Sequence, residues 1–214
     1  MPPEKIKAVL FDMDGVLIDA REWHYEALNM ALGVFGLNIS RYDHLVTFDG
    51  LPTSKKLQMM SAERGLPEGL HALVGELKQQ YTQELIYRHC RPHFAHQYAL
   101  SRLGKRGLRM AVCSNSIRNT VETMLTRADL LRHVEFFLSN QDVPRPKPAP
   151  DIYSAAIERL GLQPSQCLVV EDNHHGVAAA KAAGAHVMQV TGVDEVSLEN
   201  ILGAITDAET GVAA

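Results

Sequence analysis

Two aspartates close the first apolar run of the chain. Val9-Leu10-Phe11 leads into Asp12 and Asp14, which a single residue separates, and Gly15 follows. Side chains alternate along a strand, so both carboxylates are expected on the same side, and glycine lets the chain turn immediately after them. Buried carboxylates are costly to desolvate unless a cation lies beside them. The stretch predicts either a paired-carboxylate metal site or a plain acidic turn.

Two other apolar runs also end in polar side chains. Each pair follows directly on its run: Ser114-Asn115 after residues 110–113, and Glu171-Asp172 after residues 167–170. Lys147 lies between them in a proline-rich segment that limits its freedom. Taken singly, each has a structural explanation, since Ser114 and Asn115 are good helix caps and a lysine can simply be solvated. Their joint occurrence favours a shared site.

Together these groups suit phosphoryl transfer. A substrate phosphate adds negative charge to carboxylates, and the oxygen ligands of Asp12, Asp14 and Asp172 are those that Mg²⁺ prefers. Lys147, the hydroxyl-amide pair Ser114-Asn115 and backbone N–H groups are expected to hold the phosphate oxygens. One carboxylate can then attack phosphorus, and the other can move the proton.

The elements that position these groups alternate between strand and helix. Strands are expected at residues 6–11, 109–113, 135–138, 167–170 and 186–190. Helices are expected at residues 94–103, 120–128, 151–160, 176–183 and 197–205. Such alternation predicts an α/β fold with a parallel sheet and helices on both faces. In sheets of this kind the site lies beyond the carboxyl ends of the strands.

A helical insertion interrupts this alternation. Asp19 to Glu22 has the pattern of a capping box, with Asp19 as the cap of a first helix that Gly36 ends. A turn at Gly50 to Thr53 starts another helix, and a long helical pattern covers Leu70 to Ile86. We therefore expect a core of residues 1–19 and 91–214 and an α-helical domain of residues 20–90.

Composition excludes several classes of protein. The 214 residues are 46% apolar and 21% charged, and the net charge of −4 gives no reason to expect a nucleic acid or an anionic membrane as partner. Three cysteines without CxxC spacing indicate buried free thiols and a reducing compartment. The first residues lack the apolar segment of a signal peptide, and no apolar run is long enough to span a bilayer. A cytoplasmic monomer is the expectation.

The motifs resemble those of the haloacid dehalogenase-like superfamily of phosphotransferases. Four motifs occur in the family's order: Phe11-Asp12-Met13-Asp14-Gly15, Ser114-Asn115, Lys147-Pro148-Ala149-Pro150, and Val170-Glu171-Asp172 followed by Gly176. The helical insertion resembles the small α-helical cap of the branch that contains β-phosphoglucomutase and phosphoglycolate phosphatase. The resemblance implies a Rossmann-like core and a cap that closes over the site.

The resemblance also implies individual roles. Asp12 would be the nucleophile and Asp14 the general acid and base, while Ser114 would bind phosphate and Lys147 would balance charge. Asp172 would complete a Mg²⁺ site together with Asp12 and Asp14, and Glu171 would support it. In the cap, His24, Thr53 and Lys78 are the candidate substrate residues, although His24 and Lys78 have surface roles as the alternative. From the residues themselves, His174 and His175 at the start of a helix are expected to form a polar rim, with a transition-metal site as the alternative.

Several functions remain open on these residues. The favoured one is a Mg²⁺-dependent phosphatase that hydrolyses a small phosphorylated metabolite, most simply a sugar phosphate, through an aspartyl-phosphate. A sugar phosphomutase is the alternative, but Thr53 stands where the mutase has an arginine for its second phosphate. A catalytically silent binding module is disfavoured by the intact set of Asp12, Asp14, Lys147 and Asp172, and a dehalogenase by the second aspartate.

Overall fold

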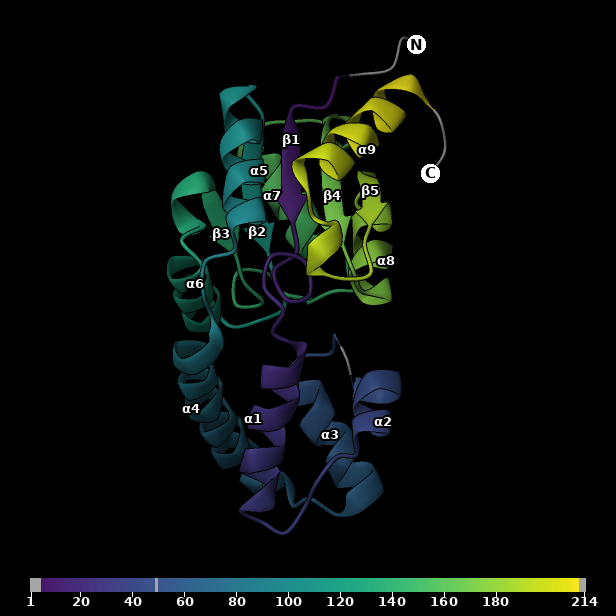
Figure 1. The fold of residues 1–214 in the computed structure, drawn as a ribbon. Helices are drawn as coiled ribbons and strands as arrows, with labels where there is room; N and C mark the ends of the chain where they lie inside the picture. The colour runs from purple at the N-terminus through teal and green to yellow at the C-terminus, as the bar shows by residue number, and fades with distance from the viewer. Residues whose placement is uncertain (1–4, 49, 212–214) are drawn as a thin grey trace. The chain divides into compact units, whose positions relative to one another are not determined.

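The computed structural model describes residues 5–48 and 50–211. The first four residues, on which the expectation about a signal peptide partly depends, lie outside this range. The chain divides into two compact units, one of residues Met1–Asp19 with Arg91–Ala214 and one of residues Ala20–Cys90. We call them the core unit and the helical unit and describe each by itself (Figure 1).

Five parallel strands form the sheet of the core unit. They are β1 (Ala8–Phe11), β2 (Arg109–Cys113), β3 (Phe136–Leu138), β4 (Cys167–Glu171) and β5 (His186–Gln189). Their order is β3-β2-β1-β4-β5, so β1 is central and is paired on both sides. All four residues of β1 are buried, as its continuous apolar run requires. The predicted α/β fold with a parallel sheet is confirmed.

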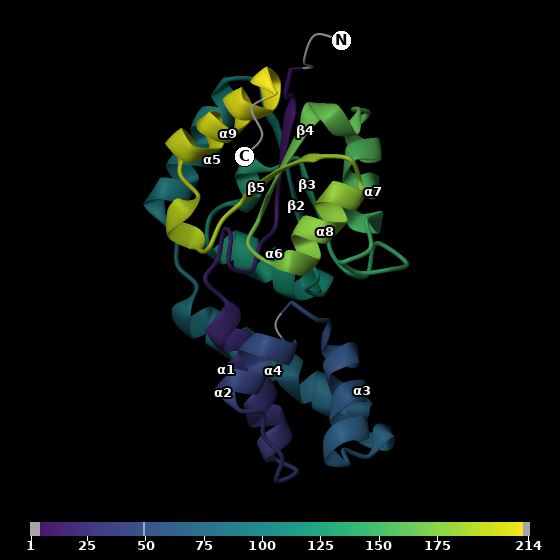
Figure 2. The same ribbon diagram turned by 90° about the vertical axis from the view of Figure 1, so that its right-hand side faces the viewer.

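Helices cover both faces of this sheet. The core unit contains α5 (Phe94–Lys105), α6 (Arg118–Arg127), α7 (Asp151–Leu160), α8 (His174–Ala182) and α9 (Leu198–Thr210). Figure 2 shows α5 and α9 on one face and α7 and α8 on the other. Ala8 and Leu10 of β1 lie in the apolar cluster that α7 and α8 cover, because alternate side chains of a strand share a face.

The helical unit consists of helices that run between β1 and α5 in the sequence. They are α1 (Arg21–Gly33), α2 (Arg41–Asp43), α3 (Thr53–Arg64) and α4 (His71–His89), with a π-helical turn at His44–Phe48. The unit has an apolar core of its own, to which Leu32, Phe48, Met60 and Val74 contribute. None of the helices in the described residues is both long and apolar enough to cross a membrane.

The start of α1 differs from the predicted capping box. Ala20 occupies the N-cap position, and no side chain accepts a hydrogen bond there. Its carbonyl accepts the hydrogen bond of the His24 amide, so the helix begins one residue later than a cap at Asp19 needs. Ala20 is fully buried, and its packing outweighs the preference of Asp for the cap position.

Candidate active site

Asp12 follows directly on β1, at the carboxyl end of the central strand. Its backbone N–H still bonds the carbonyl of Val170 on β4, at 3.0 Å, so the sheet fixes its position. The chain then turns back, with Gly15 at a φ of +90° and its N–H bonded to the Ile18 carbonyl at 2.7 Å. That left-handed conformation explains why glycine follows the second aspartate.

Lys147 supplies the cation that the buried carboxylates need. Its side chain is 4% exposed, and its Nζ donates to Asp12 Oδ1 at 2.6 Å, Glu171 Oε1 at 2.7 Å and the Cys113 carbonyl at 2.8 Å. These three acceptors match the three donors of an ammonium group. A buried charge is tolerated when it is paired and hydrogen-bonded in this way.

The electrostatics of this cluster favour a further cation. Burial raises the pKa of Asp12 well above its ordinary value, Lys147 opposes that rise, and Glu171, Asp172 and Asp14 add to it. The pKa of Lys147 is raised in turn, because Asp12 and Glu171 outweigh the effect of its burial. One lysine thus faces several carboxylates, and a divalent cation among them would favour the ionised form of Asp12.

A group of acids with suitable geometry for a metal lies beside Lys147. One carboxylate oxygen from each of Asp12, Glu171 and Asp172 lies within 4.8 Å of the others. All are hard oxygen donors of the type that Mg²⁺ binds. The donor set therefore fits the predicted metal, although the sequence assigned Asp14 rather than Glu171 to its ligands.

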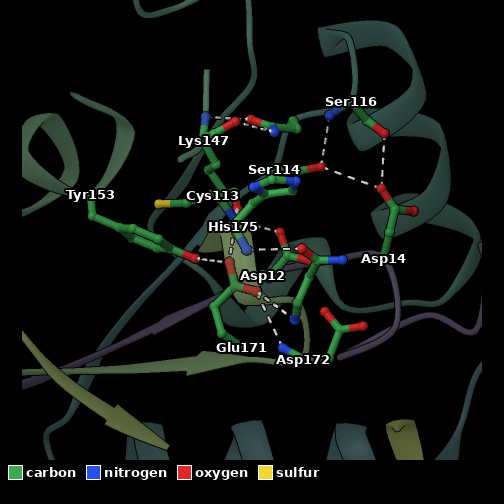
Figure 3. Close-up of polar contacts among 12 residues, drawn as sticks. Asp12, Asp14, Cys113, Ser114, Ser116, Lys147, Tyr153, Glu171, Asp172 and His175 are labelled. Carbon is green, nitrogen blue, oxygen red and sulfur yellow. Dashed lines mark hydrogen bonds and ion pairs between the residues drawn. The ribbon is translucent and has the colours of Figure 1, made fainter. Parts of the chain in front are cut away.

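Asp14 is oriented by the loop that follows β2. Ser116 Oγ donates to Asp14 Oδ2 at 2.9 Å, and Ser114 Oγ lies 3.5 Å from the same oxygen (Figure 3). Ser114 Oγ also accepts the Ser116 N–H at 3.0 Å. Ser114 was predicted from the sequence, whereas Ser116 was not. The available signal was that Ser116 is a second hydroxyl residue, two positions after Ser114 in the same loop.

Asn115 braces the loop that carries Lys147. Its Oδ1 accepts the Lys147 N–H at 3.0 Å, and its Nδ2 donates to the Lys147 carbonyl at 3.2 Å. The Asn115 carbonyl in turn accepts from the Asn140 amide at 2.8 Å. These contacts connect two loops that are distant in the sequence, and a direct contact of the Asn115 amide with phosphate stays a prediction.

Glu171 and Asp172 end β4 and lead into α8. Glu171 Oε2 accepts the backbone N–H groups of Asp172 and Asn173, at 3.2 and 3.4 Å. Asn173 is the N-cap of α8, and its side chain accepts the His175 N–H at 2.9 Å. The rings of His174 and His175 lie against each other, with centroids 3.9 Å apart. Asn173 therefore acts as a helix cap directly after the acidic pair.

The candidate cap residues all lie in the helical unit. Lys78 of α4 is buried, at 7% exposure, and its Nζ lies 3.2 Å from His24 Nδ1 on α1. The alternative of a solvated helix face for Lys78 is thus wrong, because α1 and α4 pack against each other and bring this pair together, while its role as a substrate residue stays a prediction. Thr53 is the first residue of α3.

Comparisons with known proteins identify a family of related sequences. The model of the haloacid dehalogenase-like hydrolase family matches residues 9–190. The fructose-1-phosphate phosphatase YqaB of Escherichia coli K12 is 30% identical over 189 residues, which are 87% of this chain and 97% of that protein. A phosphorylated carbohydrates phosphatase of Thermotoga maritima is 28% identical over 182 residues, which cover 84% and 82% of the two chains.

A solved structure shows the same fold. The β-phosphoglucomutase of Clostridium difficile superimposes with a TM-score of 0.81 at 19% identity, covering 94% of this chain and 98% of that one. At this identity the likeness concerns the fold alone, and it agrees with the predicted Rossmann-like architecture.

Proposed function

Since the chain belongs to the haloacid dehalogenase-like hydrolase family, we propose that it is a Mg²⁺-dependent phosphatase of a small sugar phosphate. The observation that carries the proposal is the buried contact of Lys147 with Asp12 at the end of β1, with Asp172 beside it. Relatives named as phosphatases of fructose 1-phosphate and of phosphorylated carbohydrates support the substrate class.

The first half of the reaction uses Asp12 as the nucleophile. Its carboxylate oxygen attacks phosphorus, and the bond between phosphorus and the sugar oxygen breaks. Asp14, which Ser116 holds in place, donates its proton to the departing oxygen. The products of this half are the free alcohol and an aspartyl-phosphate on Asp12.

The second half returns the enzyme to its starting state. Asp14 accepts a proton from a water molecule, the water oxygen attacks phosphorus, and the bond from phosphorus to Asp12 breaks to release inorganic phosphate. Lys147 compensates the charge on Asp12 throughout. We expect the Ser114 hydroxyl to bind a phosphate oxygen, whereas the N–H of Ser114 donates to the Leu138 carbonyl and the N–H of Ser116 to Ser114 Oγ.

The metal would be held by Asp12, by Asp172, and by Asp14 or its backbone carbonyl. When bound, Mg²⁺ supplies positive charge that reduces the repulsion between the substrate phosphate and the carboxylates. The geometry of Glu171, whose oxygens already accept from Lys147 and from backbone N–H groups, suits a supporting role.

We further propose that the helical unit is the cap that selects the substrate. His24 and Lys78 form a polar pair within it, and Thr53 starts a neighbouring helix of the same unit. An ammonium group with an imidazole beside it suits recognition of a hydroxyl-rich anionic substrate. A cytoplasmic location and a monomeric state stay predictions.

A phosphate-release screen tests this function. Purified protein is incubated with fructose 1-phosphate, glucose 1-phosphate, phosphoglycolate and nucleotides, with Mg²⁺ or with a chelator. We expect release from at least one sugar phosphate, its loss with the chelator and its return with added Mg²⁺. Absence of release from every substrate in the presence of metal would contradict the proposal. Isomerisation of glucose 1-phosphate without free phosphate, when a trace of the bisphosphate is added, would identify a mutase instead.

A further inference from the structure

The phenol of Tyr153 contacts two members of the charged cluster, and the proposed chemistry has so far given it no role. Its hydroxyl donates to Glu171 Oε1 at 2.5 Å, and Lys147 Nζ lies 4.7 Å from the centroid of its ring. Figure 3 shows the ring beside Lys147, with the hydroxyl directed at Glu171. Tyr153 is fully buried. Burial also raises the pKa of its phenol well above the ordinary value, so the hydroxyl keeps its proton.

The contacts of Glu171 explain why this hydroxyl matters. Its Oε1 accepts from Lys147 and from Tyr153, and its Oε2 accepts from the N–H groups of Asp172 and Asn173. A carboxylate has about four lone-pair sites, so these four donors occupy its capacity. One oxygen therefore serves the lysine that pairs with Asp12, and the other serves the backbone that carries Asp172.

The packing around Glu171 leaves its carboxylate little room. A Cβ on Gly176 would lie 1.8 Å from Glu171 Oε1, so α8 passes directly over the group. The Tyr153 hydroxyl donates to the same oxygen from α7, in which Tyr153 is the third residue. Two helices that cover this face of the sheet thus both contact the carboxylate.

We propose that Tyr153 is a positioning residue, whose hydroxyl fixes the Glu171 carboxylate so that Lys147 stays directed at Asp12. The inference rests on the proposed function, because Asp12 is its nucleophile. Tyr153 does not touch the reacting atoms and acts through Glu171 and Lys147. Without the hydroxyl, Oε1 loses one of its two donors and the carboxylate can rotate, which draws the ammonium away from Asp12.

The test compares two substitutions of Tyr153. Tyr153→Phe keeps the ring over Lys147 and removes only the hydroxyl, whereas Tyr153→Leu removes both contacts. We expect kcat to fall about 10-fold to 100-fold in Tyr153→Phe, the range for a lost hydrogen bond to a charged group, and further in Tyr153→Leu. KM is expected to change by less than about twofold, since no substrate contact is removed. Wild-type kcat in Tyr153→Phe would overturn the inference.

A control on the same helix separates positioning from packing. Ile157 of α7 is buried in the same apolar cluster as Tyr153, and its aliphatic side chain cannot form a hydrogen bond with Lys147 or Glu171. Ile157→Val is expected to lower the melting temperature while kcat stays at the wild-type value. If kcat also falls in Ile157→Val, and by the same amount per degree of lost melting temperature as in Tyr153→Phe, both effects come from packing and the inference is overturned.

A double-mutant cycle tests whether Tyr153 acts through Glu171. In a Glu171→Gln background, Tyr153→Phe is expected to lower kcat by less than about twofold, since the group it positions is already changed. Equal effects of Tyr153→Phe in both backgrounds would contradict the proposed route.

A measurement without substrate keeps the inference separate from the function. In ¹⁵N-labelled protein the ammonium of Lys147, with its three acceptors, is expected to give a slowly exchanging NMR signal that Lys147→Met removes. We expect Tyr153→Phe to weaken or abolish that signal, and its persistence unchanged would overturn the inference. If the wild type releases no phosphate but Tyr153→Phe still loses the Lys147 signal, the proposed function is refuted and the inference about Tyr153 is retained.

Discussion

At the scale of single residues, Lys147 determines whether the buried acids can exist together. It is the cation in contact with both Asp12 and Glu171, and a buried ion pair that loses one partner typically costs about 3–5 kcal/mol. The same contact keeps positive charge next to the atom that would receive the phosphoryl group. Stability and chemistry therefore depend on one ammonium group. The Asn115 side chain fixes the lysine that carries it, through hydrogen bonds to the N–H and the carbonyl of Lys147.

Ser116 provides a test of how Asp14 is held. Ser116→Ala removes the donor at 2.9 Å from Asp14 Oδ2 and leaves the longer contact from Ser114. In the proposed reaction Asp14 becomes a carboxylate once it has given up its proton, and a hydrogen bond to that form is worth about 1.5–3 kcal/mol, so we expect kcat to fall at least about tenfold. Steady-state phosphate release measures this.

The control for Ser116 is a hydroxyl on the following helix. Thr123 is half-buried, and its Oγ1 donates to the Asn119 carbonyl within α6, so Thr123→Ala is expected to leave kcat unchanged. A kcat for Ser116→Ala within twofold of wild type would show that Asp14 does not depend on this hydroxyl. A factor of about two is what one weak hydrogen bond contributes.

At the scale of elements, α8 is defined by its close approach to the end of β4. Its third residue, Gly176, faces the Glu171 carboxylate, where any side chain would collide. Glycine inside a helix is unfavourable by itself, so the contact with Glu171 is what explains it here. In α8, glycine lowers the helix propensity but leaves the room that the buried Glu171 carboxylate needs.

A pair of glycine substitutions tests this account. Gly176→Ala is expected to lower the free energy of unfolding by about 1–3 kcal/mol through overpacking, and to lower kcat because Glu171 must move. Gly203 of α9 is exposed and has no neighbour within 4 Å of a built Cβ. Gly203→Ala is expected to raise the free energy of unfolding by about 0.5–1 kcal/mol.

Chemical denaturation and phosphate release measure both variants. Equal stability changes in the two variants, with kcat unaffected in both, would show that α8 tolerates a side chain facing Glu171.

The elements were largely predictable, and their side-chain contacts were not. Strands β1, β2 and β4 contain continuous apolar runs, and the residues that follow these runs are polar, which indicated a common site at the strand ends. The cap of α1 was mispredicted at Asp19, because burial of Ala20 is a tertiary effect.

The contacts of Ser116, Tyr153 and Lys78 were harder to anticipate. Each joins segments far apart in the sequence, such as Lys78 and His24, which are 54 positions apart. For Tyr153 the available signal was a phenol on the apolar face of a helix, since a buried hydroxyl needs a partner.

At the scale of the whole core unit, His96 connects three distant segments. It lies in α5, almost fully buried, with Nδ1 3.1 Å from the Leu17 carbonyl and Nε2 2.9 Å from the Val193 carbonyl. Leu17 belongs to the turn that follows Asp14, and Val193 precedes α9. The neutral ring has one N–H, so it donates to one of these carbonyls at a time.

This histidine makes stability depend on pH. Burial lowers the pKa of His96 below its ordinary value, with His93 adding to that effect and the Val193 carbonyl, the Leu17 carbonyl and Asp194 opposing it. The unfolded chain therefore takes up a proton near pH 6.5 while the folded protein does not, and stability falls as the pH drops from about 6.5 toward the lowered pKa.

Melting temperatures at about pH 7.5 and about pH 5.5 measure this effect. The wild type is expected to lose more between the two pH values than His96→Gln, whose amide can still donate to a carbonyl but does not titrate. An equal loss in both proteins would show that His96 does not contribute to the pH dependence.

The most direct test of the proposed function is the fate of the phosphoryl group at Asp12. Wild type and Asp12→Asn are mixed with Mg²⁺ and the best substrate of the screen, quenched in acid during turnover and analysed by peptide mass spectrometry, with phosphate release measured in parallel. We expect a phosphoryl adduct on the wild-type peptide that contains Asp12, no adduct in Asp12→Asn, and a loss of phosphate release of at least about a thousandfold. Release by Asp12→Asn at the wild-type rate, or an adduct on a different residue, would contradict the assignment of Asp12 as the nucleophile.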